Sequence, residues 1–250
     1  MKDVKECLLD RTSVRRYTYD KIPQETMNYI YEAIRNTPTS YNGQQFSVID
    51  IKDQAVKENL AAVTGQKQIK TCSNFLVFCS DYNKIEMLAK RKGLEMPAIT
   101  DTMDGVIIGI IDASLAMMSA VVAAQSVGLG SNCIGYLRTA DPAKIAEILG
   151  LPKGVFVVCG LAIGFPNEQP DLKPKQPVEL VVHHDRYRND NAAMTAELAE
   201  YDEAVSHYNR TRSGHTTDND WVSHILGYYT EALKYRILDY LKAQGYNIVR

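Results

Sequence analysis

The chain has 250 residues, which suffices for one domain or two, and its apolar fraction of 45% is ordinary for a globular protein. A formal net charge of −2 excludes the strongly basic balance of a general nucleic-acid or membrane-surface binder. Five cysteines without CxxC or zinc-type spacing argue against a disulfide framework and predict reduced thiols in the cytoplasm.

The N-terminal region contains no apolar run long enough for a signal peptide. Residues 2–10 predict a short helix, and Arg11, Ser13 and Arg15 follow it. Val14 favours an extended segment here, in which alternate side chains point the same way. Guanidinium and hydroxyl groups suit phosphate oxygens, so this segment is a candidate anion site. The alternative is a solvated basic loop.

A helix that starts at Pro23 and stops before Pro38 precedes a polar loop. The apolar side chains of this helix follow the i, i+3, i+4, i+7 spacing of a core-facing stripe: Met27, Ile30, Tyr31 and Ile34. Loop residues 37–45 are dense in hydroxyl and amide groups, which could bind a polar ligand or simply form a turn.

The middle of the chain alternates short apolar runs with periodic segments. We expect strands at 46–51, 75–79, 133–134 and 155–163, and helices at 54–63, 81–91 and 141–149. The last apolar run is continuous, which is typical of a central strand covered on both faces. Gly128, Gly130 and Gly135 do not match the GxGxxG spacing, so a Rossmann dinucleotide-binding fingerprint is not expected.

Residues 104–127 are the most apolar stretch and predict one long helix that ends at Gly128. Apolar or small residues cover nearly every face of it, and such a helix must be buried. Asp112 and several serines, without a flanking positive cluster, argue against a membrane span. We expect a core helix of a soluble protein. Its small residues would let another helix approach closely, either within an ordinary monomer core or from a second copy of the chain.

Lys173 and Lys175 flank Pro174, whose restricted backbone could aim both amines at a second phosphate contact. The alternative is a surface loop. His183 and His184 have no spaced carboxylate or cysteine partner, so no metal site is expected.

The C-terminal part predicts an amphipathic helix at 192–209, a polar connection, and a helical arm at 221–244 that should pack on another surface, a partner subunit included. The inward side chains of the first helix are Leu198, Tyr201, Val205 and Tyr208. We therefore expect residues 1–250 to form a single domain in which 192–250 is a helical C-terminal extension.

Together these motifs resemble the FMN-dependent nitroreductase family, and within it the oxygen-insensitive NADPH nitroreductase and flavin reductase group. The Arg11-x-Ser13-x-Arg15 segment resembles the N-terminal FMN clamp of that family. Residues 128–138 resemble the loop at the flavin ring, and residues 172–177, which follow Gly164-Phe-Pro166, resemble a second phosphate clamp. The likeness spans almost the whole chain.

This resemblance implies an α+β, nitroreductase-like fold, in which helices wrap a central, mostly antiparallel sheet. It also implies an intertwined homodimer with two FMN sites at the subunit interface. By the same likeness, FMN would be bound by Arg11, Thr12, Ser13, Arg15, Thr39, Tyr41, Gln44, Gln66, Ile134, Gly135, Tyr136, Lys173 and Lys175.

Arg212 matches an arginine that this group uses for the extra phosphate of NADPH. A second arginine of the group is replaced here by Thr217 or Asp218, and an aspartate would repel that phosphate. Both NADPH and NADH therefore stay open as donors. The loop before Gln66 is one residue shorter than in close relatives.

The implied function is a ping-pong transfer of hydride from NAD(P)H through flavin N5 to nitroaromatics, quinones or free flavin. No catalytic side chain is expected, because the flavin carries the chemistry. An open stacking slot would accept many small, flat aromatic acceptors. Two alternatives stay open: a flavin-binding sensor protein without turnover, and a flavoenzyme of the same fold with other reductive chemistry.

Overall fold

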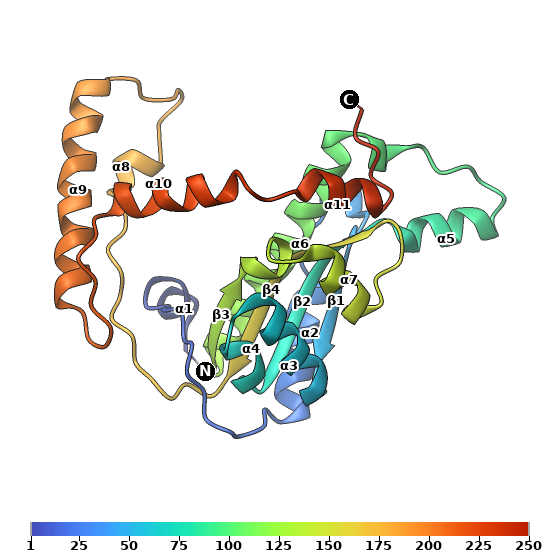
Figure 1. The fold of residues 1–250 in the computed structure, drawn as a ribbon, viewed down its shortest axis with the longest axis horizontal. Coiled ribbons are helices and arrows are strands. Elements are labelled where there is room, and N and C mark those ends of the chain that lie inside the picture. Colours follow the sequence, from blue (N-terminus) through green and yellow to red (C-terminus); the bar gives the residue numbers. More distant parts are fainter. Residues whose placement is uncertain (1, 250) are drawn as a thin grey trace. The chain divides into compact units, whose positions relative to one another are not determined.

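We describe residues 2–249 in a computed structural model of the chain, in which they form two compact units (Figure 1). The first unit comprises the chain up to Gln169 and from Arg236 onward, and the second comprises Pro170–Tyr235. The sheet and the helices that cover it belong to the first unit.

In the described part of the chain, the sheet has four strands in the order β1-β2-β4-β3, and every neighbouring pair is antiparallel. This confirms the expected α+β class. The strands are β1 (Phe46–Ile51), β2 (Asn74–Asp81), β3 (Gly130–Ile134) and β4 (Val155–Gly164). β3 begins earlier than expected, because its first residues are small or polar and yet pair with β4.

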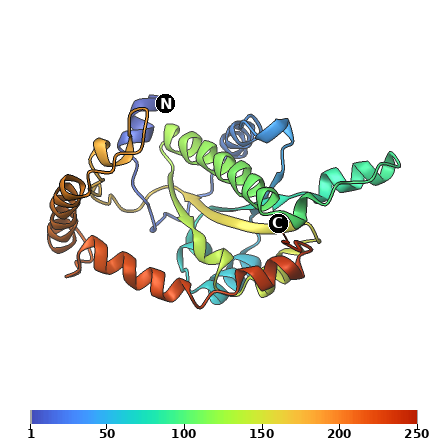
Figure 2. The same cartoon turned by 90° about the horizontal axis from the view of Figure 1, so that it is seen from above.

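Helices cover both faces of this sheet (Figure 2). One face is covered by α2 (Gln24–Arg35) and α6 (Met103–Ser126), and the other by α3 (Gln54–Thr64), α4 (Gln68–Thr71) and α7 (Pro142–Leu149). Leu76 and Phe78 of β2 pack with the first group, whereas Phe75 and Val77 pack with the second. Since alternate strand side chains face opposite sides, β2 is buried along its whole length.

The helix ends follow local sequence signals. The Asp141 side chain accepts a hydrogen bond from the Lys144 N–H, with Pro142 in the first turn of α7. Gly65 ends α3 with a left-handed φ of 69°. Pro23 differs slightly from expectation: it is the N-cap of α2, one residue outside the helix.

The long helix α6 is buried on one face only. It packs on the sheet and on α2, and Ala113 and Ala116 are fully buried there. By length and composition α6 could also cross a membrane, but half of its most apolar window lies inside the protein. The expectation of burial on every face is therefore wrong for a single chain. Exposed apolar side chains form a stripe along its outer face: Ile107, Ile111, Leu115 and Met118.

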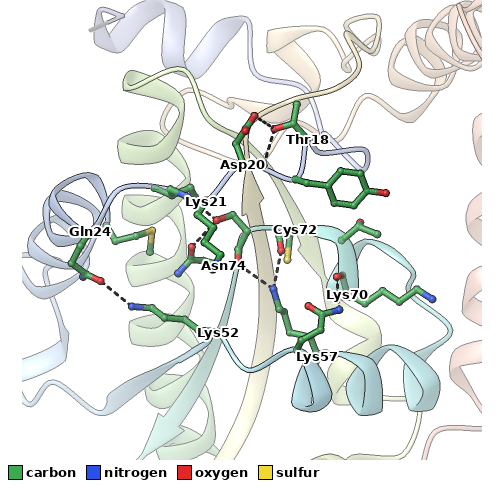
Figure 3. Close-up of a pocket in the computed structure, with 15 residues that line it drawn as sticks. Thr18, Asp20, Lys21, Gln24, Lys52, Lys57, Lys70, Cys72 and Asn74 are labelled. Atoms are coloured by element: carbon green, nitrogen blue, oxygen red, sulfur yellow. Dashed lines mark hydrogen bonds between the residues drawn. The ribbon is translucent and has the colours of Figure 1, made fainter.

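Lys57 is a buried cation that the sequence did not single out. Its side chain is 4% exposed, and Nζ donates to the carbonyl oxygens of Cys72 (2.9 Å) and Ser73 (3.1 Å) (Figure 3). These bonds tie α3 to the residues that lead into β2. The same residues border a cavity of about 450 Å³, which none of the expected flavin-binding residues lines.

The remaining elements of the first unit are α1 (Val4–Leu9), α5 (Asn83–Arg91), α11 (Ile237–Ala243) and the 3₁₀ turns η1 (Ser40–Asn42), η2 (Ile99–Asp101) and η3 (Gly135–Arg138). The second unit contains α8 (Val178–Val181), α9 (Asn191–Thr211) and α10 (Trp221–Ala232). The expected arm at 221–244 is thus broken between α10 and α11. Beyond α11, the fully buried Tyr246 packs its ring edge-on against Phe156, with centroids 5.1 Å apart.

Candidate functional site

The N-terminal segment, residues 11–17, runs as an extended chain beside the start of β3. Ser13 forms a parallel bridge to Ser131, and the Val14 N–H donates to the Ser131 carbonyl oxygen (3.0 Å). The buried Tyr17 hydroxyl lies 2.6 Å from the Val14 carbonyl oxygen and 3.2 Å from one in β4. Burial raises the pKa of Tyr17, so this hydroxyl stays a neutral donor. The extended conformation expected here is confirmed.

The Glu168 carboxylate holds the backbone of this segment. Two arginine side chains of the segment have no carboxylate partner in the part of the chain that the structure describes. Glu168 Oε1 accepts hydrogen bonds from the N–H groups of Arg15 (2.5 Å) and Arg16 (3.1 Å). Within residues 2–249 the guanidinium groups of Arg11 and Arg15 form no ion pair, and Arg15 Nη1 reaches only the Ser13 carbonyl oxygen (3.3 Å). Two permanent charges on a fixed backbone suit the recognition of an anion such as phosphate.

The end of β3 lies beside this segment. Burial raises the pKa of the Cys133 thiol, and the nearby Arg11 charge partly opposes that rise. Ile134 is buried, and the chain then turns into η3, where Gly135 and Tyr136 are exposed. The structure therefore brings residues 11–15 and 130–136 together, although more than a hundred residues separate them in sequence.

The polar loop, residues 37–45, is held in a conformation that its residues seldom adopt. Its left-handed residues are Tyr41 (φ 57°), Asn42 (φ 52°) and Gln44 (φ 54°). Each such residue costs about 1–2 kcal/mol, so the loop needs support from elsewhere. Asp112 and Ser119 of α6 supply hydrogen bonds to it, and the Gln44 N–H donates to Thr39 Oγ1 (3.2 Å).

Gln66 lies just beyond the glycine that ends α3, and α3 packs against η3. Its Oε1 accepts a hydrogen bond from Gln68 Nε2 (2.7 Å). In the described chain no hydrogen bond links Gln66 or the polar loop to the N-terminal segment. A shared contact of these three parts with one ligand is therefore still a prediction.

Three residues that we expect to bind FMN or the nicotinamide donor lie in the second unit: Lys173, Lys175 and Arg212. Lys173 and Lys175 lie in the segment before α8, to which no helix or strand is assigned. Arg212 ends α9, where its Nε donates to the His215 carbonyl oxygen (2.7 Å) and its guanidinium lies 5.7 Å from the Tyr208 ring centroid. The Ser213 N–H donates to Asp171 (2.6 Å), and this bond lowers the pKa of that carboxyl. That these residues share a ligand with the first unit is a prediction.

Sequence reasoning missed three residues that hold the candidate site: Tyr17, Asp112 and Glu168. A signal for Asp112 was available, because a carboxylate inside an apolar helix must find hydrogen-bond donors within the protein. Glu168 gave no local signal, since the N–H groups that it binds are 153 and 152 residues away.

Two family models match the chain: that of the nitroreductase family over residues 8–165, and that of the C-terminal domain of the nitroreductase family over residues 173–249. An FMN reductase [NAD(P)H] of Bacillus subtilis is 34% identical over 249 residues, which is 99% of each chain. An oxygen-insensitive NADPH nitroreductase of Salmonella typhimurium is 34% identical over 96% of this chain and 97% of its own.

Solved structures agree with this similarity. A hypothetical oxidoreductase from Bacillus subtilis superimposes with a TM-score of 0.94 at 34% identity, over the full length of both chains. An NADPH:FMN oxidoreductase from Vibrio harveyi in complex with NAD⁺ gives a TM-score of 0.85 at 28% identity, over 98% of each chain.

Proposed function

Because the chain belongs to the nitroreductase family, we propose that it is an FMN-dependent oxidoreductase that takes hydride from NAD(P)H and reduces small, flat aromatic acceptors. Nitroaromatics, quinones and free flavin are the acceptor classes. Donor and acceptor would use the same face of the flavin in turn, in a ping-pong cycle.

The observation that carries this proposal is the pair of guanidinium groups of Arg11 and Arg15, which have no ion pair in the described chain and stand on a backbone fixed beside β3. Ser13, between them, adds a hydroxyl. This donor set suits the phosphate dianion of FMN, because charge-assisted hydrogen bonds to phosphate are roughly twice as strong as neutral ones.

The full set of proposed FMN contacts is the one that the family resemblance implies: Arg11, Thr12, Ser13, Arg15, Thr39, Tyr41, Gln44, Gln66, Ile134, Gly135, Tyr136, Lys173 and Lys175. Bound FMN supplies the hydride chemistry. The protein binds the phosphate, orients the ring and leaves a slot for a second flat ring. No side chain is assigned as acid or base. Arg212 is proposed to bind the phosphate of the nicotinamide donor.

We also propose that the protein is a homodimer in the cytoplasm. The exposed apolar stripe on α6 supports a dimer, because a soluble monomer seldom leaves such a row of side chains in water. All five cysteines are free thiols, which suits a reducing compartment. We further propose that residues 1–250 form a single domain in which 192–250 is a helical C-terminal extension.

Anaerobic reduction of the bound flavin tests the proposal. Purified protein is mixed with NADPH and, separately, with NADH, and the flavin absorbance is followed before and after addition of menadione or a nitrofuran. We expect the flavin to bleach with at least one donor and to recover with the acceptor. A yellow protein whose flavin stays oxidised with both donors would instead be a flavin-binding protein without turnover.

A further inference from the structure

Asp112 is a buried carboxylate in the middle of α6 that meets no cation in the described chain. Its side chain is 0% exposed. Oδ1 accepts a hydrogen bond from the Ser40 N–H (3.0 Å), and Oδ2 accepts one from the Gln45 N–H (3.2 Å). The two oxygens of one carboxylate therefore hold the polar loop at the first residue of η1 and again at Gln45, after η1 has ended.

The helix that carries Asp112 is itself seated firmly on the sheet. One turn earlier, a Cβ added to Gly109 would lie 2.0 Å from Ser80 Oγ of β2, so α6 and β2 are in close contact there. Two turns after Asp112, Ser119 Oγ lies 2.7 Å from Thr37 Oγ1, at the start of the loop. The loop is thus hydrogen-bonded to α6 at two positions along the helix, Asp112 and Ser119. Because α6 packs closely on β2, these bonds also fix the position of the loop relative to the sheet.

The loop has hydrogen bonds of its own, and the Asp81 N–H donates to the Gln45 carbonyl oxygen (3.0 Å), yet three of its residues keep a conformation that side chains seldom adopt. Tyr41, Asn42 and Gln44 are all left-handed. The side-chain amide of Gln45 is pressed against Gly43, where an added Cβ would meet Nε2 at 2.2 Å, and Gln45 Oε1 is buried without a donor in the described chain. The two bonds to Asp112 are therefore part of what opposes relaxation of the loop toward more ordinary conformations.

We propose that Asp112 is a positioning residue for the flavin: it holds residues 39–45 in the shape in which Thr39, Tyr41 and Gln44 contact FMN, before FMN arrives. This inference rests on the proposed function. Because the loop is ordered in advance, flavin binding does not have to order it. The geometry supports this role, since both oxygens of the carboxylate accept hydrogen bonds from backbone N–H groups of this loop.

The test compares Asp112→Asn with Val121→Ala. The asparagine keeps one acceptor oxygen but turns an NH₂ donor toward the second N–H group, so one anchor is lost. Val121 is buried on the same helix, and its aliphatic side chain cannot form a hydrogen bond to the loop, so Val121→Ala lowers stability without removing an anchor. For both variants we would measure the melting temperature, the FMN dissociation constant, the visible circular dichroism of bound FMN, and hydrogen exchange at Ser40 and Gln45.

We expect Asp112→Asn to raise the FMN dissociation constant about tenfold or more, to alter the circular dichroism of the flavin, and to speed exchange at whichever of the two amides faces the new NH₂ group. Val121→Ala should leave the dissociation constant within about twofold, by the independence of distant sites. Equal weakening in both variants, or unchanged FMN binding in Asp112→Asn, overturns the proposal.

Wild-type protein supplies a second test, which does not depend on whether Asp112→Asn folds. In flavin-free wild-type protein the Ser40 and Gln45 amides should already be protected from exchange, and free exchange there overturns the positioning role. Failure of the proposed function would show differently, because the wild-type protein would then either take up no FMN or bind FMN that neither NADPH nor NADH reduces.

Discussion

Val14 occupies the space beside Gly130, where a Cβ added to the glycine would lie 2.8 Å from the Val14 Cβ. Gly164 is the partner of Gly130 across the β3–β4 ladder, and it stands in the same relation to Tyr17, whose ring an added Cβ would meet at 2.8 Å. Because two facing glycines lack side chains, the N-terminal segment can pack directly against the β3–β4 pair, and this packing positions Arg15.

Gly130→Ala should displace that segment. Because Val14 has no flexible end that could move away, we expect a loss of about 1–3 kcal/mol in the free energy of unfolding and weaker FMN binding. Urea denaturation and flavin fluorescence measure the two effects. Gly227→Ala is the control, since an added Cβ there meets nothing within 4 Å. If Gly130→Ala were as stable as wild type, the close packing of Val14 against Gly130 would not be needed for stability.

Arg15→Ala and Arg16→Ala remove the same charge from adjacent positions. Arg16 is 80% exposed and lies 3.8 Å from Glu168, whereas Arg15 has no ion pair in residues 2–249. Loss of a charge-assisted phosphate contact should lower the FMN affinity of Arg15→Ala by about 1.5–3 kcal/mol, with little change for Arg16→Ala. Equilibrium dialysis measures both affinities. Equal affinities in the two variants would remove Arg15 from the phosphate contact.

Asp218→Asn should shift donor preference toward NADPH. The Asp218 side chain is 90% exposed, so its repulsion of the extra phosphate is screened by water and amounts to about 0.2–1 kcal/mol. We expect the ratio of kcat/KM for NADPH to that for NADH to rise by a factor between about 1.4 and 5, and the gain to shrink at high salt. Glu200→Gln removes a charge from the exposed face of α9 as a control. An unchanged ratio would mean that the phosphate binds away from Asp218.

Leu115→Glu tests the dimer. Leu115 is 42% exposed in the centre of the α6 stripe. If the stripe is the dimer interface, a charged side chain there should destabilise the dimer, because burying an unpaired charge is costly. Sedimentation velocity should show a shift from dimer to monomer. Tyr19→Glu, at a side chain that is 96% exposed on another segment, should leave the dimer intact. If Leu115→Glu sediments as a dimer like wild type, the interface lies elsewhere.

Cys133 offers a pH-dependent readout of the same site. It is the exposed thiol among five cysteines that all lie in the described chain. Although the residue as a whole is exposed, partial burial of its thiol raises the pKa above the ordinary value of 9.0, so less thiolate is present at pH 8 than in a free thiol. Iodoacetamide should react slowly, faster as pH rises, and more slowly still in Arg11→Ala and after FMN is added. Faster alkylation than that of a free thiol at pH 8 would contradict the raised pKa.

Local patterns in the sequence predicted much of this protein. The apolar runs at 46–51 and 155–163, the Pro142 start of α7 and the glycine end of α3 all match the structure. These features can be predicted because strand burial and helix capping depend on residues a few positions apart. The motifs that resemble the nitroreductase family are local in the same sense, and the family assignment is confirmed.

Tertiary structure alone decided how the candidate site is held. Asp112 meets the Ser40 N–H across 72 residues, and Glu168 meets the Arg15 N–H across 153. Neither carboxylate has a partner near it in sequence that would reveal its role. The outer face of α6 was also decided by packing, because an apolar helix looks the same in sequence whether one face or all of its faces are covered.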